Sequence, residues 1–182
     1  MTQALLVIDV QESFRSTERW QTISNPSVVD AVARLVARFR EHGSPVFWIL
    51  HADPGSGNAF DPENGLVQVL AELEPAPGEQ LLVKTTINAF TSTDLEELLR
   101  AEGVDEVVLC GIRTEQCVEP TARIATDLGF ATTVVIDATA TNPAGALSAR
   151  EVIERTAEVL AAREFAEVVT LESLGLAAPV SG

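Results

Sequence analysis

The sequence predicts a three-layer α/β/α fold, with helices on both faces of a doubly wound, mainly parallel sheet. Three observations support this prediction. Short apolar runs alternate with segments of helical periodicity along the chain. The runs are continuously apolar rather than alternating, which is typical of parallel strands covered on both faces. Capping residues and glycines separate these segments, as expected for helices with defined ends.

Six apolar runs are expected to form the strands. The strong runs are 5–8, 46–50, 107–109 and 132–136, and the weaker ones are 81–83 and 167–170. Their order with the intervening segments gives about six β-α units, which join parallel strands by crossover connections. Because no linker or internal repeat interrupts this pattern, residues 1–182 are expected to form one domain.

The helices between these runs carry start and stop signals. Between residues 52 and 65 the chain is instead rich in Gly, Pro, Asn and Asp, which predicts a loop long enough to form one wall of a site. Four helices are expected. The first begins at Asn25-Pro26 and ends at Gly43, and the second begins at a capping box, Thr93–Glu96. The third begins at Thr114 and ends near Gly129, and the fourth begins at Asn142-Pro143 and ends near Arg163.

Composition excludes some classes of binding partner. The chain is 46% apolar and 21% charged, with a formal net charge of −15, which argues against nucleic acid and anionic membranes as partners. No apolar run approaches the ~20 residues of a membrane span, and the N-terminus lacks the basic start of a signal peptide. Two cysteines allow at most one disulfide. A cytoplasmic, reduced protein is therefore expected.

Several polar residues follow the predicted strands directly. They are Asp9, His51, Lys84 and the turn that spans residues 111–117. In doubly wound sheets the ligand crevice lies beyond the carboxyl ends of the strands, where the strand order reverses. These residues are therefore expected to converge at one edge of the sheet.

Each of these residues also has a structural interpretation. Cys117 opens a predicted helix, where the backbone dipole favours the thiolate, although a buried structural thiol remains the alternative. Cys110 lies within a strand and is expected to be inert. Asp9 follows a fully apolar strand, so it is either a base of raised pKa or a turn cap. Lys84, the only lysine, is either functional or simply solvated.

Together these residues resemble the isochorismatase-like cysteine hydrolases, the superfamily of nicotinamidases, N-carbamoylsarcosine amidases and isochorismatases. The resemblance rests on residues 6–14, on Lys84 with residues 88–90 and 93–95, and on residues 111–118 with 121–123. It implies the strand order 3-2-1-4-5-6 and a catalytic triad of Asp9, Lys84 and Cys117. It also implies a cis peptide between Ile112 and Arg113, with the N–H groups of Arg113 and Cys117 forming an oxyanion hole.

The chain departs from this family at two places. Nicotinamidases carry an Asp-x-His pair and a further histidine as metal ligands, whereas here the order is His51-Ala52-Asp53 and the other histidine, His42, lies at a helix end. No metal and no cofactor are therefore expected. Many family members have a small residue where this chain has Arg113. Its side chain either faces the pocket, favouring an anionic or carbonyl-rich substrate, or faces solvent or a neighbouring subunit.

The sequence thus predicts a metal-independent hydrolase that cleaves an amide or carbamoyl C–N bond of a small molecule through a Cys117 thioester. The alternatives are vinyl ether hydrolysis of the isochorismatase type and a non-catalytic protein that binds small molecules. Family members commonly form dimers or larger rings, so a homo-oligomer is expected. The expected substrate-binding residues are Phe14, Trp48, His51, Phe60, Ile87, Phe90 and Arg113.

Overall fold

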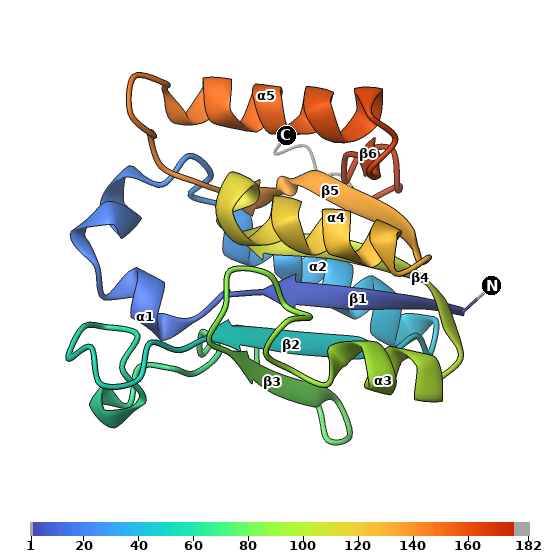
Figure 1. Cartoon of the computed structure of the whole chain (residues 1–182), viewed down its shortest axis with the longest axis horizontal. Helices are drawn as coiled ribbons and strands as arrows, with labels where there is room; N and C mark the ends of the chain where they lie inside the picture. The colour runs from blue at the N-terminus through green and yellow to red at the C-terminus, as the bar shows by residue number, and fades with distance from the viewer. Residues whose placement is uncertain (1, 177–182) are drawn as a thin grey trace, which may run out of the picture.

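The computed structural model describes residues 2–176 and contains a six-stranded parallel sheet (Figure 1). The strand order is β3-β2-β1-β4-β5-β6, which confirms the predicted fold class and order. All six apolar runs form strands, and their bounds are β1 Thr2–Ile8, β2 Val46–His51, β3 Gln80–Lys84, β4 Val104–Ile112, β5 Ala131–Ala140 and β6 Glu167–Val169.

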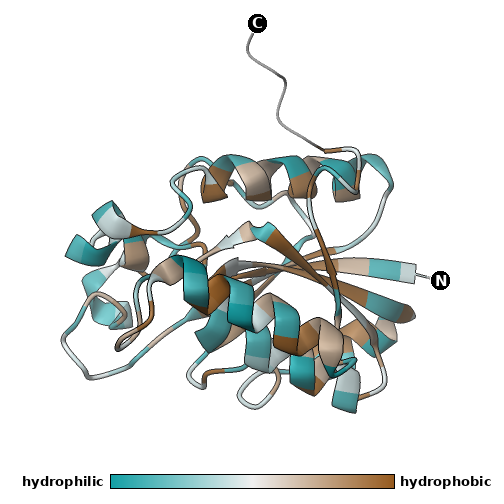
Figure 2. Ribbon diagram, turned by 90° about the horizontal axis from the view of Figure 1, so that it is seen from above, coloured by the Kyte–Doolittle hydropathy of each residue, from teal (hydrophilic) through white to brown (hydrophobic). Residues whose placement is uncertain are grey.

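Helices cover both faces of this sheet. The α-helices are α1 Glu12–Arg15, α2 Val28–Glu41, α3 Leu95–Ala101, α4 Glu119–Asp127 and α5 Ala149–Ala162. The apolar side of α2 packs on one face of the sheet, in a core that contains Leu35 and Trp48. Residues of α3, α4 and α5 pack on the other face, in a core that contains Phe47 and Leu160. Figure 2 shows the resulting distribution, with hydrophobic strands inside and many hydrophilic residues on the outer sides of the helices.

The connection between β2 and β3 differs from the predicted β-α alternation. It contains no α-helix, only the short 3-10 helix Pro62–Asn64 within a long irregular segment. The reason is composition, because the connection holds four prolines and four glycines between Pro54 and Gly78, which interrupt helical hydrogen bonding. This segment lies on the same face as α2, where Leu70 and Leu73 join the core.

The predicted starts of α2, α3 and α5 were wrong. Helix α2 begins at Val28, because the Asn25 side chain accepts a hydrogen bond from the Ser27 N–H in a preceding turn. Helix α3 begins at Leu95 without a capping box, although the Thr93 hydroxyl accepts from the Leu95 N–H.

The third wrong start is that of α5, which begins at Ala149 instead of Asn142. Ser148 and Glu151 form a full capping box there. The Asn142 side chain instead donates to the backbone carbonyl of Arg19. A local capping signal closer to the helix therefore decided the boundary.

The order of the strands brings the candidate site residues together. Strands β1 and β4 are neighbours at the reversal of the strand order, with Ile8 paired to Gly111. His51 pairs with Lys84 at the ends of β2 and β3. Asp9, Lys84 and the turn after β4 therefore reach the same edge of the sheet, as predicted. Within residues 2–176, no helix combines the length and apolar character needed to cross a membrane.

Candidate active site

Asp9, Lys84 and Cys117 form a buried cluster at the carboxyl ends of the strands. Lys84 Nζ lies 2.9 Å from Asp9 Oδ2 and 3.7 Å from Cys117 Sγ. Asp9 and Lys84 are completely buried, and the Cys117 side chain is 8% exposed. Lys84 Nζ also donates to the Thr86 carbonyl, at 3.2 Å. Lys84 therefore contacts both the carboxylate and the thiol, rather than extending into solvent.

Burial shifts the protonation of this cluster. It raises the pKa of Asp9, and the charge of Lys84 opposes that shift. Burial also raises the pKa of the Cys117 thiol, the negative charge of Asp9 acts in the same direction, and Lys84 opposes both. These effects favour the protonated thiol and oppose the thiolate that the helix start was expected to favour, since loss of hydration acts against the backbone dipole. Asp9 lies beside Cys117 as a group that can accept its proton.

Neither carboxylate oxygen of Asp9 has a hydrogen bond of good angular geometry among the described residues, so the short approach to Lys84 is best called an ion pair. Asp9 itself has φ of 54°, a left-handed conformation uncommon for a residue other than glycine. Its N–H continues the sheet by donating to the Ile49 carbonyl at 2.7 Å. The backbone is thus fixed by the sheet at the point where the side chain meets Lys84.

The turn that carries Cys117 is a π-helical turn, Thr114–Val118, which leads directly into α4. The sequence predicted an ordinary helix capped by Thr114, and this was wrong. The Thr114 hydroxyl bonds the Thr139 hydroxyl of β5, and the residue that precedes the turn is Arg113. Single π-helical turns are rare and occur frequently at functional sites.

The peptide bond between Ile112 and Arg113 is cis, at the position that the family resemblance implies. The N–H groups of Gln116, Cys117 and Val118 all donate to the Arg113 carbonyl, at 3.0–3.2 Å. The Cys117 N–H therefore already has an acceptor. The Arg113 N–H instead interacts with the Cys117 thiol and acts to lower its pKa. Of the two expected oxyanion donors, Arg113 is the one directed at the sulfur.

Gly111 allows β4 to approach β1 closely just before this turn. Its φ is 123°, and a Cβ added there would lie 2.0 Å from the backbone oxygen of Ile8. Real Cβ atoms do not approach a backbone oxygen so closely, so only glycine fits this position. The contact holds the Cys117 turn beside the residue that precedes Asp9. The sequence placed Gly111 in this turn but gave no sign of the close approach.

A cavity of about 210 Å³ opens onto the cluster. It contains five of the seven expected substrate-binding residues. Asp53, for which the sequence left substrate contact open, also lines it. Gln116 lines it too and was not expected, although it lies three residues after Arg113 in the same turn. The full lining is Asp9, Phe14, His51, Asp53, Phe60, Ile87, Arg113, Gln116 and Cys117.

Trp48 and Phe90 do not line this cavity, so the prediction that they bind substrate was wrong for both. Trp48 is 1% exposed in the core beneath α2, and its Nε1 donates to Glu79. Its position in β2 explains this, because alternate residues of a strand face opposite sides of the sheet. Phe90 instead packs against the second core and stacks on Phe130, with ring centroids 6.3 Å apart.

His51 lies between the buried cluster and the cavity. Its Nδ1 is 3.4 Å from Lys84 Nζ, and its ring packs against Phe60. Burial and the charge of Lys84 both lower the pKa of His51. A neutral imidazole that accepts from Lys84 through Nδ1 carries its proton on Nε2, so it can act as a donor.

Gln11 fixes the backbone of His51 and was not identified from the sequence. Its side-chain oxygen accepts from the His51 N–H at 2.7 Å, and its Nε2 donates to the His51 carbonyl at 2.9 Å. Nε2 also donates to the Ser13 hydroxyl. Gln11 thus joins the segment after Asp9 to the end of β2. The available signal was the position of Gln11, two residues after the candidate base Asp9.

Comparisons with known proteins agree with this geometry. Residues 3–173 match the family model of the isochorismatase domain. The chain belongs to the isochorismatase family. Over 139 residues it is 37% identical to a streptothricin hydrolase of Streptomyces noursei, covering 76% of this chain and 50% of that protein. Over 171 residues it is 29% identical to the ureidoacrylate amidohydrolase RutB of Cronobacter sakazakii, covering 75% of this chain and 73% of that protein.

A solved structure extends the similarity to the whole fold. An isochorismatase-family protein from Chromobacterium violaceum is 32% identical and superposes with a TM-score of 0.85, covering 95% of this chain and 91% of that one. Membership of the family makes this protein an isochorismatase-family hydrolase.

The residues available as metal ligands differ from those that the family resemblance assigns to nicotinamidases. His51 and Asp53 line the cavity, but His42 lies at the end of α2, where its Nδ1 is 2.7 Å from the Arg38 carbonyl. Among residues 2–176 no three His, Cys, Asp or Glu side chains are grouped so that they could hold a metal ion. A catalytic zinc site uses three protein ligands, which this isochorismatase-family chain does not bring together there.

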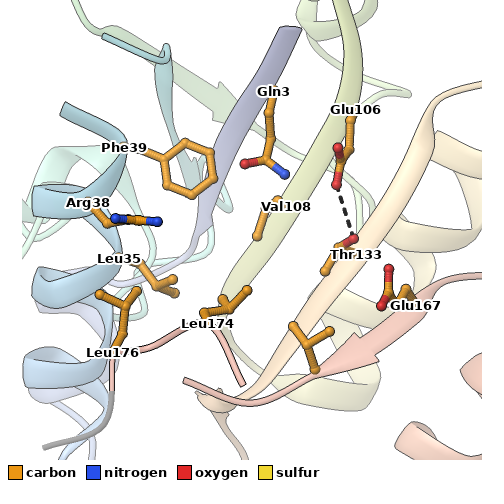
Figure 3. A pocket seen from close by; sticks show the side chains of 11 residues that line it. Gln3, Leu35, Arg38, Phe39, Glu106, Val108, Thr133, Glu167, Leu174 and Leu176 are labelled. Carbon is orange, nitrogen blue, oxygen red and sulfur yellow. Dashed lines mark hydrogen bonds between the residues drawn. The ribbon is translucent and has the colours of Figure 1, made fainter. Parts of the chain in front are cut away.

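A second cavity, of about 200 Å³, lies on the α2 face near the amino ends of the strands (Figure 3). Gln3, Glu106 and Thr133 line it from the sheet, and the Thr133 hydroxyl donates to Glu106 at 3.3 Å. Arg38 and Phe39 approach from α2, and the other lining residues are Leu35, Val108, Glu167, Val169, Leu174 and Leu176. None of the residues expected in the catalytic site lies there.

Proposed function

We propose that this chain is a metal-independent cysteine hydrolase that cleaves an amide or carbamoyl-type C–N bond of a small molecule. The observation that supports this proposal is the buried cluster of Asp9, Lys84 and Cys117, of which Asp9 and Cys117 line a small cavity. A nucleophile beside a base, with a third group that holds the base, is the arrangement used for covalent acyl transfer. The amidohydrolase named among the relatives supports the C–N bond class.

The first half of the reaction forms a thioester. Asp9 accepts the Cys117 thiol proton as the sulfur attacks the carbonyl carbon, and the negative charge moves from the carboxylate to the carbonyl oxygen. Asp9 then gives that proton to the leaving nitrogen, the C–N bond breaks, and the amine departs. Lys84 lies beside both groups and stabilises whichever neighbour carries the negative charge. The raised pKa of Asp9 suits a group that both takes and returns a proton.

The second half releases the acid. Water gives a proton to Asp9 as its oxygen attacks the thioester carbonyl, the C–S bond breaks, and the departing sulfur takes that proton back. The Arg113 N–H is the backbone donor best placed beside the sulfur to stabilise the oxyanion in both halves. The Cys117 N–H would have to weaken its bond to the Arg113 carbonyl to contribute.

Alkylation by iodoacetamide tests the nucleophile. The two cysteines are matched controls for each other, because both are buried and neither forms a disulfide. We expect Cys117, which lines the cavity, to be labelled much faster than Cys110, which is 0% exposed. Mass mapping of the alkylated peptide measures this preference. Faster labelling of Cys110 would refute the assignment.

Substitution of each cysteine tests the chemistry with a screen of small amides and carbamoyl compounds, read as release of ammonia or amine. Cys117→Ala is expected to lower the hydrolysis rate by at least about 10³-fold, as for other covalent nucleophiles. Cys110→Ala is expected to retain activity. Vinyl ether hydrolysis needs no thiol, so activity that survives in Cys117→Ala would support that alternative. Binding without turnover in every variant would support a non-catalytic protein.

Assembly into a homo-oligomer and a cytoplasmic location remain predictions. Sedimentation of the purified chain tests the first, since a monomer at micromolar concentration would contradict it. Cell fractionation tests the second.

A further inference from the structure

Arg113 forms part of the cavity wall without a carboxylate partner. Its guanidinium lies 5.4 Å from the centre of the Phe14 ring, and Nη1 donates to Gln116 Oε1 at 3.0 Å. Nε is buried and has no hydrogen-bond acceptor. Nη2 likewise makes no hydrogen bond with any residue in the 2–176 range, and none of the salt bridges there includes Arg113. Nη2 is therefore the unpaired donor that solvent reaches, whereas Nε is enclosed by protein atoms.

The charges around Arg113 do not neutralise it. Burial and the nearby Arg19 lower the pKa of Arg113, while Glu115 has the opposite effect. Glu115 accepts a hydrogen bond from the Thr141 hydroxyl and makes no salt bridge with Arg113. Asp9, at the bottom of the cavity, is paired with Lys84. A half-buried cation that lacks a counter-ion loses hydration without compensation, and an anionic ligand would restore it.

Asp53 is the remaining charged group on the cavity wall. It is exposed to solvent, and its carboxylate accepts a hydrogen bond from Asn58 Nδ2 at 3.0 Å. Water therefore screens its charge more strongly than that of Arg113. The aromatic pair Phe14 and Phe60, with ring centroids 4.8 Å apart, forms the apolar part of the wall. The cavity thus combines an apolar surface, one unpaired guanidinium N–H group and the buried nucleophile.

We propose that Arg113 determines substrate specificity by binding a carboxylate that the substrate carries close to its scissile C–N bond. The inference rests on the proposed function, because it requires Cys117 to be the reacting atom. A guanidinium N–H group binds a carboxylate through a charge-assisted hydrogen bond. Gln116 and Phe14 hold the guanidinium through Nη1 and from its face, and Nε is enclosed, which leaves Nη2 available to the substrate.

Two alkylating reagents test this proposal without knowledge of the natural substrate. Iodoacetate and iodoacetamide transfer similar groups to a thiolate with loss of iodide, but only iodoacetate carries a carboxylate. The measurement is the ratio of the two second-order rates at Cys117, read from the mass of the labelled peptide. Iodoacetamide corrects this ratio for any change in the reactivity of the thiol itself.

We expect Arg113→Gln to lower the iodoacetate-to-iodoacetamide ratio about tenfold, on the scale of one charge-assisted hydrogen bond. Arg113→Lys keeps the charge but replaces the guanidinium, so its ratio is expected to lie between those of the original chain and Arg113→Gln. Arg19→Gln is the matched control, because it removes a nearby positive charge that lies outside the cavity lining. Its ratio is expected to stay within about twofold of the original, since exposed charges are screened by salt.

The outcomes separate this inference from the proposed function. An equal ratio in the original chain and in Arg113→Gln would overturn the role of Arg113 while leaving Cys117 as the nucleophile. Equal losses in Arg113→Gln and Arg19→Gln would also overturn it, because a general positive field would then explain the preference. Failure of both reagents to label Cys117 in the original chain would refute the proposed function, and the inference with it. Unchanged thermal unfolding of each variant establishes that the fold is retained.

Discussion

Two cavities of nearly equal volume lie at opposite ends of the same sheet. The cavity at the carboxyl ends measures about 210 Å³, and the one at the amino ends about 200 Å³. The first borders an ion pair with both partners at 0% exposure. Charged residues also line the second, but Arg38 and Glu167 are exposed. The volumes are alike, so volume does not distinguish the two; the burial of the charged groups does.

The difference follows from the parallel sheet. The strand order reverses between β1 and β4. At the carboxyl ends, side chains at or just after the ends of β1, β3 and β4 therefore meet. At the amino ends, helix α2 and residues 171–176 cover the sheet with aliphatic groups such as Leu35 and Leu174. A buried charge in low dielectric interacts strongly with its neighbours, whereas an exposed charge interacts mainly with water. Substitutions of similar type at the two ends should therefore have very different effects.

The largest difference is expected from removing one cation at each end. Lys84→Met leaves the buried Asp9 without its partner, which typically lowers the free energy of unfolding by about 3–5 kcal/mol. Arg38→Met removes an exposed cation from the other cavity and is expected to change it by less than about 0.5 kcal/mol. Urea unfolding measures both values. Similar losses of unfolding free energy in the two variants would show that burial of the charge does not distinguish the two ends of the sheet.

Glycines at the two ends of β4 provide the next comparison. Gly111→Ala places a Cβ 2.0 Å from the Ile8 backbone oxygen, so β1 and β4 must separate, at a cost of about 3 kcal/mol or more. Gly103 precedes the strand with φ of 66° and open space around it. Gly103→Ala is therefore expected to cost only the ~1 kcal/mol of a left-handed backbone. Unfolding curves that shift equally for the two variants would contradict this difference in packing.

The pH dependence of Cys117 alkylation tests the coupling within the carboxyl-end cluster. Alkylation requires the pair Asp9 and Cys117 to hold no more than one proton, so its rate falls as pH decreases through the first titration of the pair. Because burial raises the pKa of Asp9, this step is expected above its ordinary value of 3.8. A second increase is expected at alkaline pH, since the pKa of Cys117 is also raised.

Asp9→Asn is the control for this profile. The variant cannot accept the thiol proton, so the acidic step should disappear and only the alkaline increase should remain. The rate of iodoacetamide labelling between pH 4 and pH 10 provides the measurement. An acidic step that persists in Asp9→Asn would assign it to another group, with His51 next to be tested, although its pKa is lowered.

The smallest effect is expected at the amino-end cavity. Glu106→Gln keeps the shape of the side chain and leaves an oxygen to accept from the Thr133 hydroxyl. The free energy of unfolding should change by less than about 0.5 kcal/mol, and the rate of Cys117 labelling should not change. A slower labelling rate in this variant would show that the two cavities are coupled through the sheet.

Much of the fold followed from the sequence because buried parallel strands are continuously apolar. All six runs became strands, and the positions of Asp9 and Lys84 directly after two of them predicted their convergence. The β2–β3 connection did not follow, although its prolines and glycines argued against a helix. The start of α5 was missed because its two candidate capping residues, Asn142 and Ser148, lie six residues apart, and only packing shows which one the helix uses.

The site was less predictable because its details depend on contacts between distant segments. The raised pKa of Cys117 comes from burial beneath the loops, which a local motif does not reveal. The Gln11 contacts with His51 span 40 residues, and the Gly111 approach to Ile8 spans 103. Trp48 could have been excluded from the substrate-binding residues. Side chains alternate along a strand, so Trp48 faces the side of β2 opposite to Phe47 and Ile49.

Lys84 is the only lysine among the 182 residues and is completely buried. Within this chain, amine-directed reagents such as N-hydroxysuccinimide esters therefore find no lysine side chain on the surface of the folded protein. Enzymes that acetylate or ubiquitinate lysine would meet the same obstacle. Modification of Lys84 by such a reagent requires local opening of the site, so its rate reports directly how often the cluster becomes exposed.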